Sequence, residues 1–242
     1  MGAFRIFVTR LKTLIMKTIK PLLATLGMFV TLGIFAADYT VDANYITIPM
    51  KAPQSHGAKV MRLQVVNSRI VRVQSTPERQ FPVKNSLIIV PQQEFSDFKV
   101  SQEGNRVLVT TSDVRAVVDV RDGRVEFYDT SGKKQYLAES TRGGKAFKRF
   151  RVPDREIGAD GRITQEQRLG WTWNATFQSP DDEAFYGLGQ HQSEELNMKG
   201  KNEDLFQYNT KISVPFVLSN KGYGLLWDSY SYCRFGNPDD YL

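Results

Sequence analysis

The sequence predicts an all-β protein, an antiparallel β-sandwich preceded by a signal peptide. Two observations carry this prediction. From residue 38 onward, short β-branched and aromatic runs recur at intervals of roughly 8–12 residues, and turn residues separate them. No amphipathic pattern in this part is long enough for a helix of more than two turns. The length of 242 residues is sufficient to bury a sizeable core in one large β domain.

The first element is an apolar segment, and it divides the chain into a signal peptide at 1–37 and a folded domain at 38–242. Lys17 and Lys20 precede an uncharged apolar run at 22–37. This run is shorter than the about 20 apolar residues that a membrane span needs. We therefore expect a cleaved signal, a periplasmic or secreted protein, and no stable membrane span after cleavage.

Two details of this segment leave alternatives open. Ile34 or Phe35 stands where signal peptidases prefer a small residue, so an uncleaved anchor remains the alternative. Met16 begins a more typical signal sequence than Met1, which makes Met16 a second candidate for the initiator.

Charge and composition exclude several classes of function. The formal net charge is +6, but five of the 32 basic residues lie in the predicted signal, and the other 27 are balanced by 26 acidic residues. This balance does not favour nucleic-acid binding. Cys233 is the single cysteine and the histidines number two, so we expect no internal disulfide, metal site or cofactor. The 12% aromatic content fits a β-sandwich core better than sugar stacking.

The first half of the domain reads as a succession of strands. Apolar and polar residues alternate at 61–65, which predicts a half-buried strand. The Asp122-Gly123 pair predicts a hairpin, because glycine accepts a positive φ without steric cost. Ser131-Gly132 predicts the next turn. The strands expected around these turns lie at 61–65, 70–74, 87–90, 107–111, 114–120, 125–128 and 135–138.

The second half is less regular. Residues 139–167 are rich in Gly, Arg and Lys and predict a loop or an irregular hairpin with a strand at 147–152. Residues 190–209 predict a long exposed loop with a helical turn at 203–208, and 229–242 predict irregular structure. The remaining strands are expected at 169–178, 184–188, 213–219 and 223–228, the last two as a hairpin about 220–222.

Three motifs near the carboxyl end occur in a set order. They are Phe185-Tyr186-Gly187-Leu188-Gly189-Gln190-His191, Val214-Pro215-Phe216-Val217-Leu218-Ser219 and Gly222-Tyr223-Gly224-Leu225-Leu226-Trp227. Each glycine alone is typical of an ordinary turn, and Pro215 indicates an edge or a bulge. In this order and spacing the motifs resemble the amino-terminal domain of family 31 glycoside hydrolases. Residues 200–203, 206–210 and 233–237 resemble the α-xylosidase branch of that family found in Bacteroides-type xyloglucan degraders.

This resemblance implies a galactose-mutarotase-like sandwich that packs on a catalytic (β/α)₈ barrel. Retaining glycosidases need two carboxylates about 5–5.5 Å apart, and the family places them on the barrel. We therefore expect 38–242 to be truncated before that barrel and to contain no catalytic residue. The adjacent carboxylates Glu194-Glu195 and Asp181-Asp182 are predicted to be solvated turn charges. The expected function is that of a non-catalytic fragment of an α-xylosidase or α-glucosidase, acting on xyloglucan-type or other α-linked oligosaccharides.

The same resemblance implies that the loop at 190–210 reaches over the mouth of the barrel. Its candidate sugar-binding residues are Gln190, His191, Gln207, Tyr208 and Asn209, because amides pair with hydroxyls and an aromatic ring covers a sugar face. The alternative for each is a role in holding the loop. The expected partners are an α-linked oligosaccharide and the family 31 barrel domain.

Two other functions remain open. A free carbohydrate-binding module would need an exposed aromatic platform, and Trp171 and Trp173 lie on one face of a predicted strand. An aldose epimerase of mutarotase type would need a catalytic histidine and glutamate pair. Neither His56 nor His191 has such a sequence context.

Overall fold

The alternation of apolar and polar residues directs every second side chain of a strand to one face, and this pattern sets the layers of the molecule. The computed structural model describes residues 37–53, 55–82, 86–90, 93–141, 144–158, 160–191, 195–229 and 231–236, without the side chains of 152–156 and 163–169. The predicted signal peptide lies outside these residues, except Ala37.

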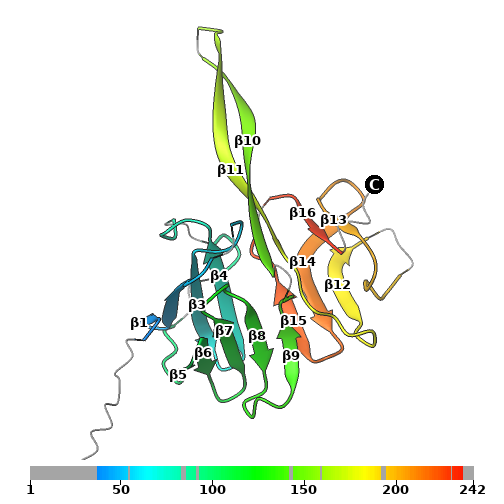
Figure 1. Cartoon of the computed structure of the whole chain (residues 1–242). Helices are drawn as coiled ribbons and strands as arrows, with labels where there is room; N and C mark the ends of the chain where they lie inside the picture. The colour runs from blue at the N-terminus through cyan, green and yellow to red at the C-terminus, as the bar shows by residue number, and fades with distance from the viewer. Residues whose placement is uncertain are drawn as a thin grey trace, which may run out of the picture. The chain divides into compact units, whose positions relative to one another are not determined.

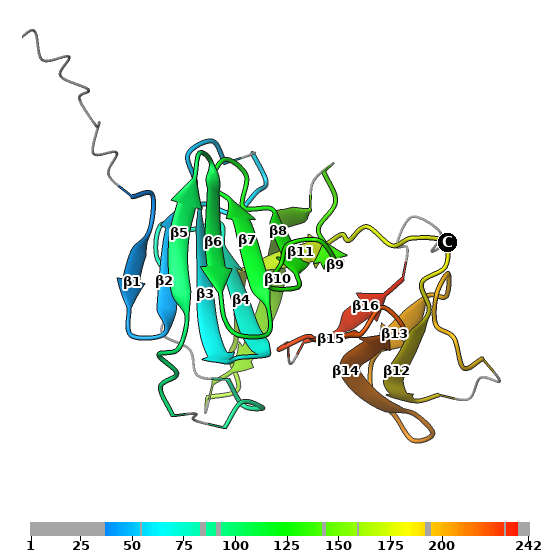
Figure 2. The same ribbon diagram turned by 90° about the horizontal axis from the view of Figure 1, so that it is seen from below.

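Two antiparallel sheets of neighbouring strands form the first part of the fold. The first sheet has the order β1-β2-β3-β4, and its strands are β1 (Thr40–Asp42), β2 (Tyr45–Pro49), β3 (Val60–Asn67) and β4 (Ile70–Thr76). The second has the order β5-β6-β7-β8-β9, and its strands are β5 (Lys99–Glu103), β6 (Arg106–Thr110), β7 (Arg115–Asp119), β8 (Val125–Tyr128) and β9 (Gln135–Ala138). The sheets face each other as two layers (Figures 1 and 2), and we call this pair of sheets the sandwich.

The main core lies between these two sheets. In β3, Met61, Leu63 and Val65 are each fully buried, which confirms the alternation predicted at 61–65. They belong to one cluster with Val109 of β6 and Val118 of β7. The predicted antiparallel β-sandwich is therefore confirmed, and so are the hairpins at Asp122-Gly123 and Ser131-Gly132.

A long two-stranded ribbon follows the sandwich (Figure 1). It consists of β10 (Lys145–Ile157) and β11 (Ile163–Ala175), which pair antiparallel along their whole length. The strand predicted at 147–152 is confirmed as part of β10. Of the two alternatives predicted for 139–167, the hairpin is the one observed, but it is longer than predicted and regular along its whole length. The ribbon pairs with no third strand among the described residues, and Phe147 near its base packs in the main core.

A three-stranded sheet forms the last part, and we call it the outer sheet. Its order is β12-β14-β15, with β12 (Phe185–Gln190), β14 (Ile212–Ser219) and β15 (Tyr223–Leu226). The short strands β13 (Glu203–Leu205) and β16 (Cys233–Phe235) pair beside it. The predicted hairpin about 220–222 is confirmed.

Three local predictions were wrong. Residues 203–208 contain no helical turn, because Glu203–Leu205 pairs as a strand with β16, which also gives regular structure to part of 229–242. Residues 87–90 form no strand, because the backbone amides of Ile88 and Ile89 donate to the Ser86 hydroxyl and turn the chain.

In the described part of the chain, no helix has the length and apolar character that crossing a membrane requires.

Candidate functional site

The glycine motif of β12 forms a bulge at the start of the candidate site. The register of β12 on β14 shifts between Gly187 and Gly189, opposite the stretch of β14 that contains Pro215, which confirms the bulge that this proline predicts. A Cβ on Gly189 would lie 2.1 Å from the Ile212 carbonyl oxygen, so only glycine fits there. Leu188 itself adopts a φ of +66°, which costs about 1–2 kcal/mol for a residue with a Cβ.

The bulge directs His191 into the protein. The side chain of His191 is only 7% exposed. Its Nε2 lies 2.8 Å from the Leu188 carbonyl oxygen, and because a carbonyl only accepts, Nε2 carries the proton. Nδ1 lies 3.2 Å from Glu203 Oε1, within ion-pair distance but outside hydrogen-bond geometry. Attraction between this ring and the carboxylate is therefore available only when the ring is protonated on both nitrogens.

Lys211 contacts the same carboxylate from the other side. Its Nζ forms an ion pair with Glu203 Oε1 and donates to the Asp204 carbonyl oxygen at 2.5 Å. The side chains of Lys211 and Glu203 are 10% and 16% exposed. We call His191, Glu203 and Lys211 the Glu203 cluster. It joins the end of β12, the start of β13 and the residue before β14.

The Glu203 cluster lies beneath a tight turn. The Lys211 amide donates to the Tyr208 carbonyl oxygen at 2.9 Å, so Asn209 and Thr210 occupy the two central positions of the turn. Both are exposed, as is Gln207. Phe206 and Tyr208 are 57% and 56% exposed, and their ring centroids lie 6.2 Å apart. Of the predicted sugar-binding residues, four are therefore exposed, namely Gln190, Gln207, Tyr208 and Asn209, whereas His191 is largely buried.

Sequence reasoning missed Glu203 and Lys211. Both lie in the predicted loop, and charged loop residues are usually solvated. No pattern in the sequence shows that three separate segments bring them together with His191. The one available signal was that a lysine directly precedes an apolar strand, where partial burial of its stem is expected.

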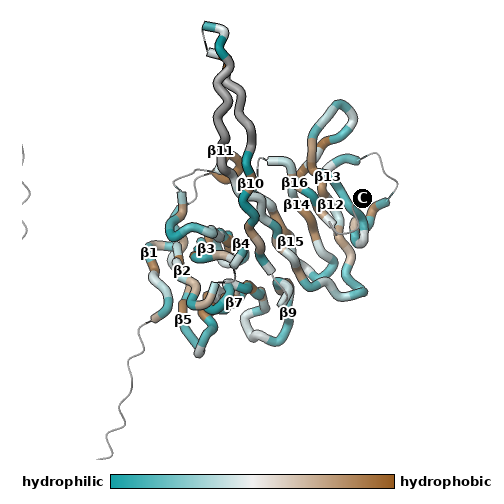
Figure 3. Tube along the Cα trace, turned by 45° about the horizontal axis from the view of Figure 1, so that its top comes forward, coloured by the Kyte–Doolittle hydropathy of each residue, from teal (hydrophilic) through white to brown (hydrophobic). Residues whose placement is uncertain are grey.

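The outer sheet exposes one apolar face. On β14 the exposed side chains alternate with buried ones, and the exposed fractions are 51% for Ile212, 42% for Val214 and 51% for Leu218. The register adds neighbours from β12 and β15 to the same side. This apolar face consists of Tyr186, Ile212, Val214, Phe216, Leu218 and Leu226. The hydropathy of these strands can be followed in Figure 3.

Nothing in the described part of the chain buries this face. The opposite side of the outer sheet is covered, because Leu188 and Val217 pack with Met198 in a small core. Contiguous exposed apolar surface of this kind marks an interaction site in a soluble protein. The outer sheet is therefore a two-faced element, with one face closed internally and the other available to a partner.

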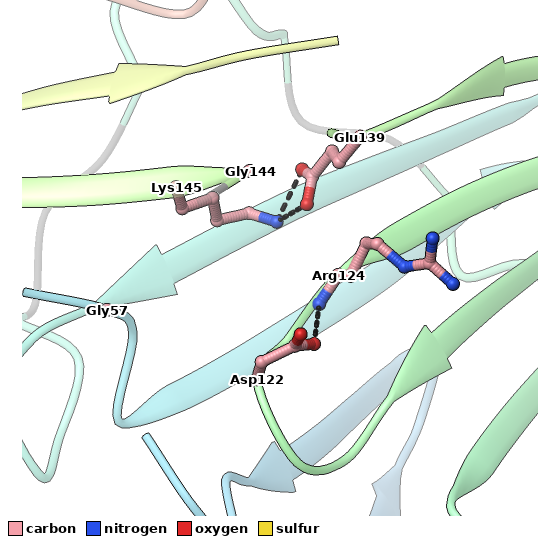
Figure 4. A pocket seen from close by; sticks show the side chains of 6 residues that line it. All are labelled: Gly57, Asp122, Arg124, Glu139, Gly144 and Lys145. Atoms are coloured by element: carbon pink, nitrogen blue, oxygen red, sulfur yellow. Dashed lines mark hydrogen bonds and ion pairs between the residues drawn. The ribbon is translucent and has the colours of Figure 1, made fainter. Parts of the chain in front are cut away.

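A second lysine and glutamate pair lies at the edge of the sandwich (Figure 4). Lys145 and Glu139 form an ion pair in which each side chain is 5% exposed, and Lys145 also donates to the Gly123 carbonyl oxygen at 3.0 Å. Burial raises the pKa of Glu139 and lowers the pKa of Lys145, and their mutual attraction opposes both shifts. The hydrogen bonds of both side chains go to groups of the sandwich and to each other, so this pair secures the base of β10 on the sandwich.

The two tryptophans of β11 form no open platform. Trp173 stacks on Trp227 at 4.5 Å between centroids, and Phe147 lies near parallel to Trp173 at 6.4 Å. The Arg149 guanidinium lies 4.8 Å from the Trp171 ring centroid. Trp171 and Trp173 are 37% and 43% exposed, but protein groups already lie against their rings. This arrangement does not favour a free carbohydrate-binding module.

Two of the adjacent carboxylates, Asp182 and Glu195, pair with surface lysines. Asp182 forms an exposed ion pair with Lys221, which holds the pKa of Asp182 below its ordinary value. Glu195 pairs with Lys201 in the same way, and its pKa is also lowered. Glu194 lies outside the described residues. Among the described residues, no three His, Cys, Asp or Glu side chains converge as a metal site would require.

The fold and these motifs define a mutarotase-like sandwich domain of the kind found in glycoside hydrolases. The family model of the glycosyl hydrolase 31 N-terminal galactose mutarotase-like domain matches residues 60–235, and the chain belongs to this family. The resemblance in the three motifs near the carboxyl end is thereby confirmed.

Similar proteins support the same assignment. An α-xylosidase of Saccharolobus solfataricus is 29% identical over 180 residues, which cover 71% of this chain and 22% of that protein. An uncharacterized family 31 glucosidase of Pseudescherichia vulneris is 27% identical over 179 residues, covering 71% of this chain and 33% of that protein. The crystal structure of a family 31 α-xylosidase from Xanthomonas citri superposes with a TM-score of 0.66 and 37% identity, covering 82% of this chain and 20% of that one. The chain thus spans at most about a third of the length of these relatives.

Proposed function

We propose that residues 38–242 serve as the non-catalytic amino-terminal domain of a secreted family 31 α-glycosidase, an α-xylosidase or α-glucosidase. In this role the domain packs on a catalytic barrel through its apolar face. The loop at 190–210 then shapes the subsites for an α-linked oligosaccharide. What supports secretion is the apolar run at 22–37, which is shorter than the about 20 apolar residues that a membrane span needs.

The observation that carries this proposal is the uncovered apolar face of the outer sheet. Its six large side chains are each between 36% and 51% exposed, which is costly in water and becomes favourable when a partner buries them. The matched relatives are three or more times longer than the matched segment, so they have additional polypeptide that could cover such a face. The α-xylosidase assignment draws on the names of two similar proteins.

The polar end of the same region supports the subsite role. The turn at 208–211 presents Asn209 to solvent next to the exposed ring of Tyr208. An amide can both donate to and accept from sugar hydroxyls, and a neighbouring ring can cover an apolar sugar face. Apolar docking surface and sugar-binding groups therefore occur on one sheet and its connected loop.

Complementation with a separate barrel tests the proposal. The Xanthomonas citri α-xylosidase, deprived of the part that this chain matches, supplies the barrel. We expect the chain to bind it and to restore turnover of an aryl α-xyloside, while the chain alone gives none. Leu218→Asp places a charge in the middle of the apolar face and is expected to weaken binding at least about tenfold, which is 1.4 kcal/mol.

A matched control separates docking from general damage. Val41 on β1 is 50% exposed, as Leu218 is 51% exposed, so Val41→Asp introduces the same charge at equal exposure on the sandwich. Equal losses of binding for the two variants would contradict docking through the apolar face. Turnover by the chain alone would contradict the non-catalytic role.

A further inference from the structure

The Glu203 cluster connects the strained bulge of β12 to the exposed turn. Leu188 accepts from His191 Nε2, and His191 Nδ1 faces Glu203 Oε1 at 3.2 Å. Lys211 holds the same oxygen of Glu203 and also contacts the Asp204 carbonyl oxygen. The chain of contacts therefore runs from the bulge through one carboxylate to the residue that ends the turn.

Lys211 acts on the turn through two different groups. Its backbone amide closes the turn on the Tyr208 carbonyl oxygen, and its ammonium group secures the turn to β13. Asn209 sits between these two anchors. A β-turn whose last residue is fixed in this way holds the backbone of its central residues, so the direction of the Asn209 side chain depends on where Lys211 is held.

We propose that His191 is a positioning residue, which, with Lys211, fixes Glu203 and thereby holds the turn at 208–211 so that Asn209 faces an α-linked sugar. This inference rests on the proposed function, and it names the residues that prepare the sugar-facing turn. His191 acts from beneath, because its side chain is only 7% exposed and its Nε2 is already committed to Leu188. Asn209 and Tyr208 remain the groups that meet the ligand.

The titratable groups around Glu203 come from three elements. His191 follows β12, Lys211 precedes β14, and Asp204 of β13 lies next to Glu203 but directs its carboxylate to the hydroxyl of Tyr232 and the guanidinium of Arg234. Glu203 is thus the carboxylate that both the Lys211 ammonium and the His191 ring face. Removing either side chain leaves Glu203 with one fewer neighbour, and the turn loses part of its connection to the bulge.

Amide hydrogen exchange of the full chain tests the positioning role without any ligand. In His191→Phe and in Lys211→Met, we expect the backbone amide of residue 211 to exchange at least about tenfold faster than in the unchanged chain. The Val118 amide, in the sandwich, should keep its rate and so report that the protein is folded. Unchanged exchange at Lys211 in both variants would overturn the proposal.

Conservative variants distinguish positioning from simple packing. Lys211→Arg keeps a cation that can reach Glu203, and His191→Gln keeps a side chain that can donate to Leu188. In each of these variants, the exchange rate of the residue 211 backbone amide should stay within about threefold of the rate in the unchanged chain. If neither does, the cluster acts only by packing, and the proposal is wrong. If His191→Phe also speeds exchange of the Val118 amide, and so unfolds the protein, the positioning role is judged from Lys211→Arg and His191→Gln alone.

The sugar is tested separately. Methyl α-D-xylopyranoside added to the unchanged chain is expected to shift the side-chain amide resonances of Asn209, and Lys211→Met should reduce this shift at least about twofold. A resonance of Asn209 that does not respond, combined with faster exchange in Lys211→Met, would refute the sugar-facing role of the turn but leave the positioning of the turn intact. Failure of both measurements would overturn the inference, whereas the complementation experiment would still stand.

Discussion

In the sandwich, the inward residues of β3 lie against those of β6 and β7, and a core of fourteen buried residues closes both sheets. In the outer sheet, three buried residues close one face, and six large side chains on the other face meet solvent. Both regions use the same alternating strands. The sandwich therefore buries its inward apolar side chains, whereas the outer sheet exposes one apolar face, which supports the proposal that this face packs on a further layer.

The two lysine and glutamate pairs also differ in how far they are enclosed. Lys145 and Glu139 are enclosed at the edge of the sandwich, and their remaining hydrogen bonds go to the Gly123 carbonyl and the Val125 amide. Lys211 and Glu203 are more exposed and lie beneath a turn that faces solvent. One pair holds the fold, and we infer that the other holds a binding loop.

The largest expected effect comes from breaking the enclosed pair. Lys145→Met leaves the Glu139 carboxylate buried without its cation and should lower the free energy of unfolding by about 3–5 kcal/mol. Adding Glu139→Leu should recover most of that loss, because no buried charge then remains. The measurement is urea-induced unfolding. A double variant no more stable than Lys145→Met would contradict this account of the pair.

The next effect compares one leucine from each region. Leu63 is fully buried in the sandwich, and Leu63→Ala should cost about 2–5 kcal/mol in urea unfolding. Leu218 has the same side chain but is 51% exposed on the apolar face, and Leu218→Ala should change stability by no more than about 0.5 kcal/mol. A large loss for Leu218→Ala would mean that the apolar face is already covered within the chain.

A smaller loss is expected for the second lysine and glutamate pair. In the same urea measurement, Lys211→Met should cost about 1–2 kcal/mol, because the Glu203 side chain keeps partial access to water and still faces His191. If Lys145→Met and Lys211→Met lowered the free energy of unfolding equally, the two pairs would not differ in their contribution to stability as we expect.

Sequence patterns predicted the sandwich well because burial imposes them. Met61, Leu63 and Val65 must be apolar to fill the core, so their alternation with polar residues is visible in the sequence itself. The strands predicted at 147–152 and 169–178 overlap the ribbon, but its full length was not predicted, because the ribbon pairs with no third strand and its sequence shows little alternation beyond its base. The strand at Glu203–Leu205 was not predicted, because its partner strand, Cys233–Phe235, lies far along the chain. Local propensity cannot report such a distant pairing.

The candidate site was predictable only in part. Pro215 predicted an edge or a bulge, and the register shift between Gly187 and Gly189 lies opposite the stretch of β14 that contains it. The amides and the aromatic ring of the loop were chosen as sugar-binding candidates from their chemistry, and that role stays a prediction. The Glu203 cluster was not predicted, because its three side chains come from separate segments of the chain. An ion pair between such segments produces no periodic pattern in the sequence.

The smallest expected effect is on the pH dependence of unfolding, and it again compares the sandwich with the region of the outer sheet. Hydrogen bonds from the Arg121 side chain hold the pKa of Asp119, at the end of β7, below its ordinary value of 3.8. Asp119 is therefore expected to contribute stability above the unfolded-state pKa and to lose it as pH falls through the lower folded-state pKa. Asp119→Asn should be less stable than the unchanged chain at pH 7, and the two should converge in acid.

Asp182 provides the control in the outer region. The Lys221 ion pair also lowers the pKa of Asp182, but the carboxylate is 76% exposed, so water and salt screen the interaction. Asp182→Asn should therefore change the pH dependence of unfolding less than Asp119→Asn does. Urea midpoints measured from neutral to acidic pH decide the comparison. Equal changes for both variants would show that enclosure in the sandwich adds nothing to the electrostatic stabilisation of Asp119.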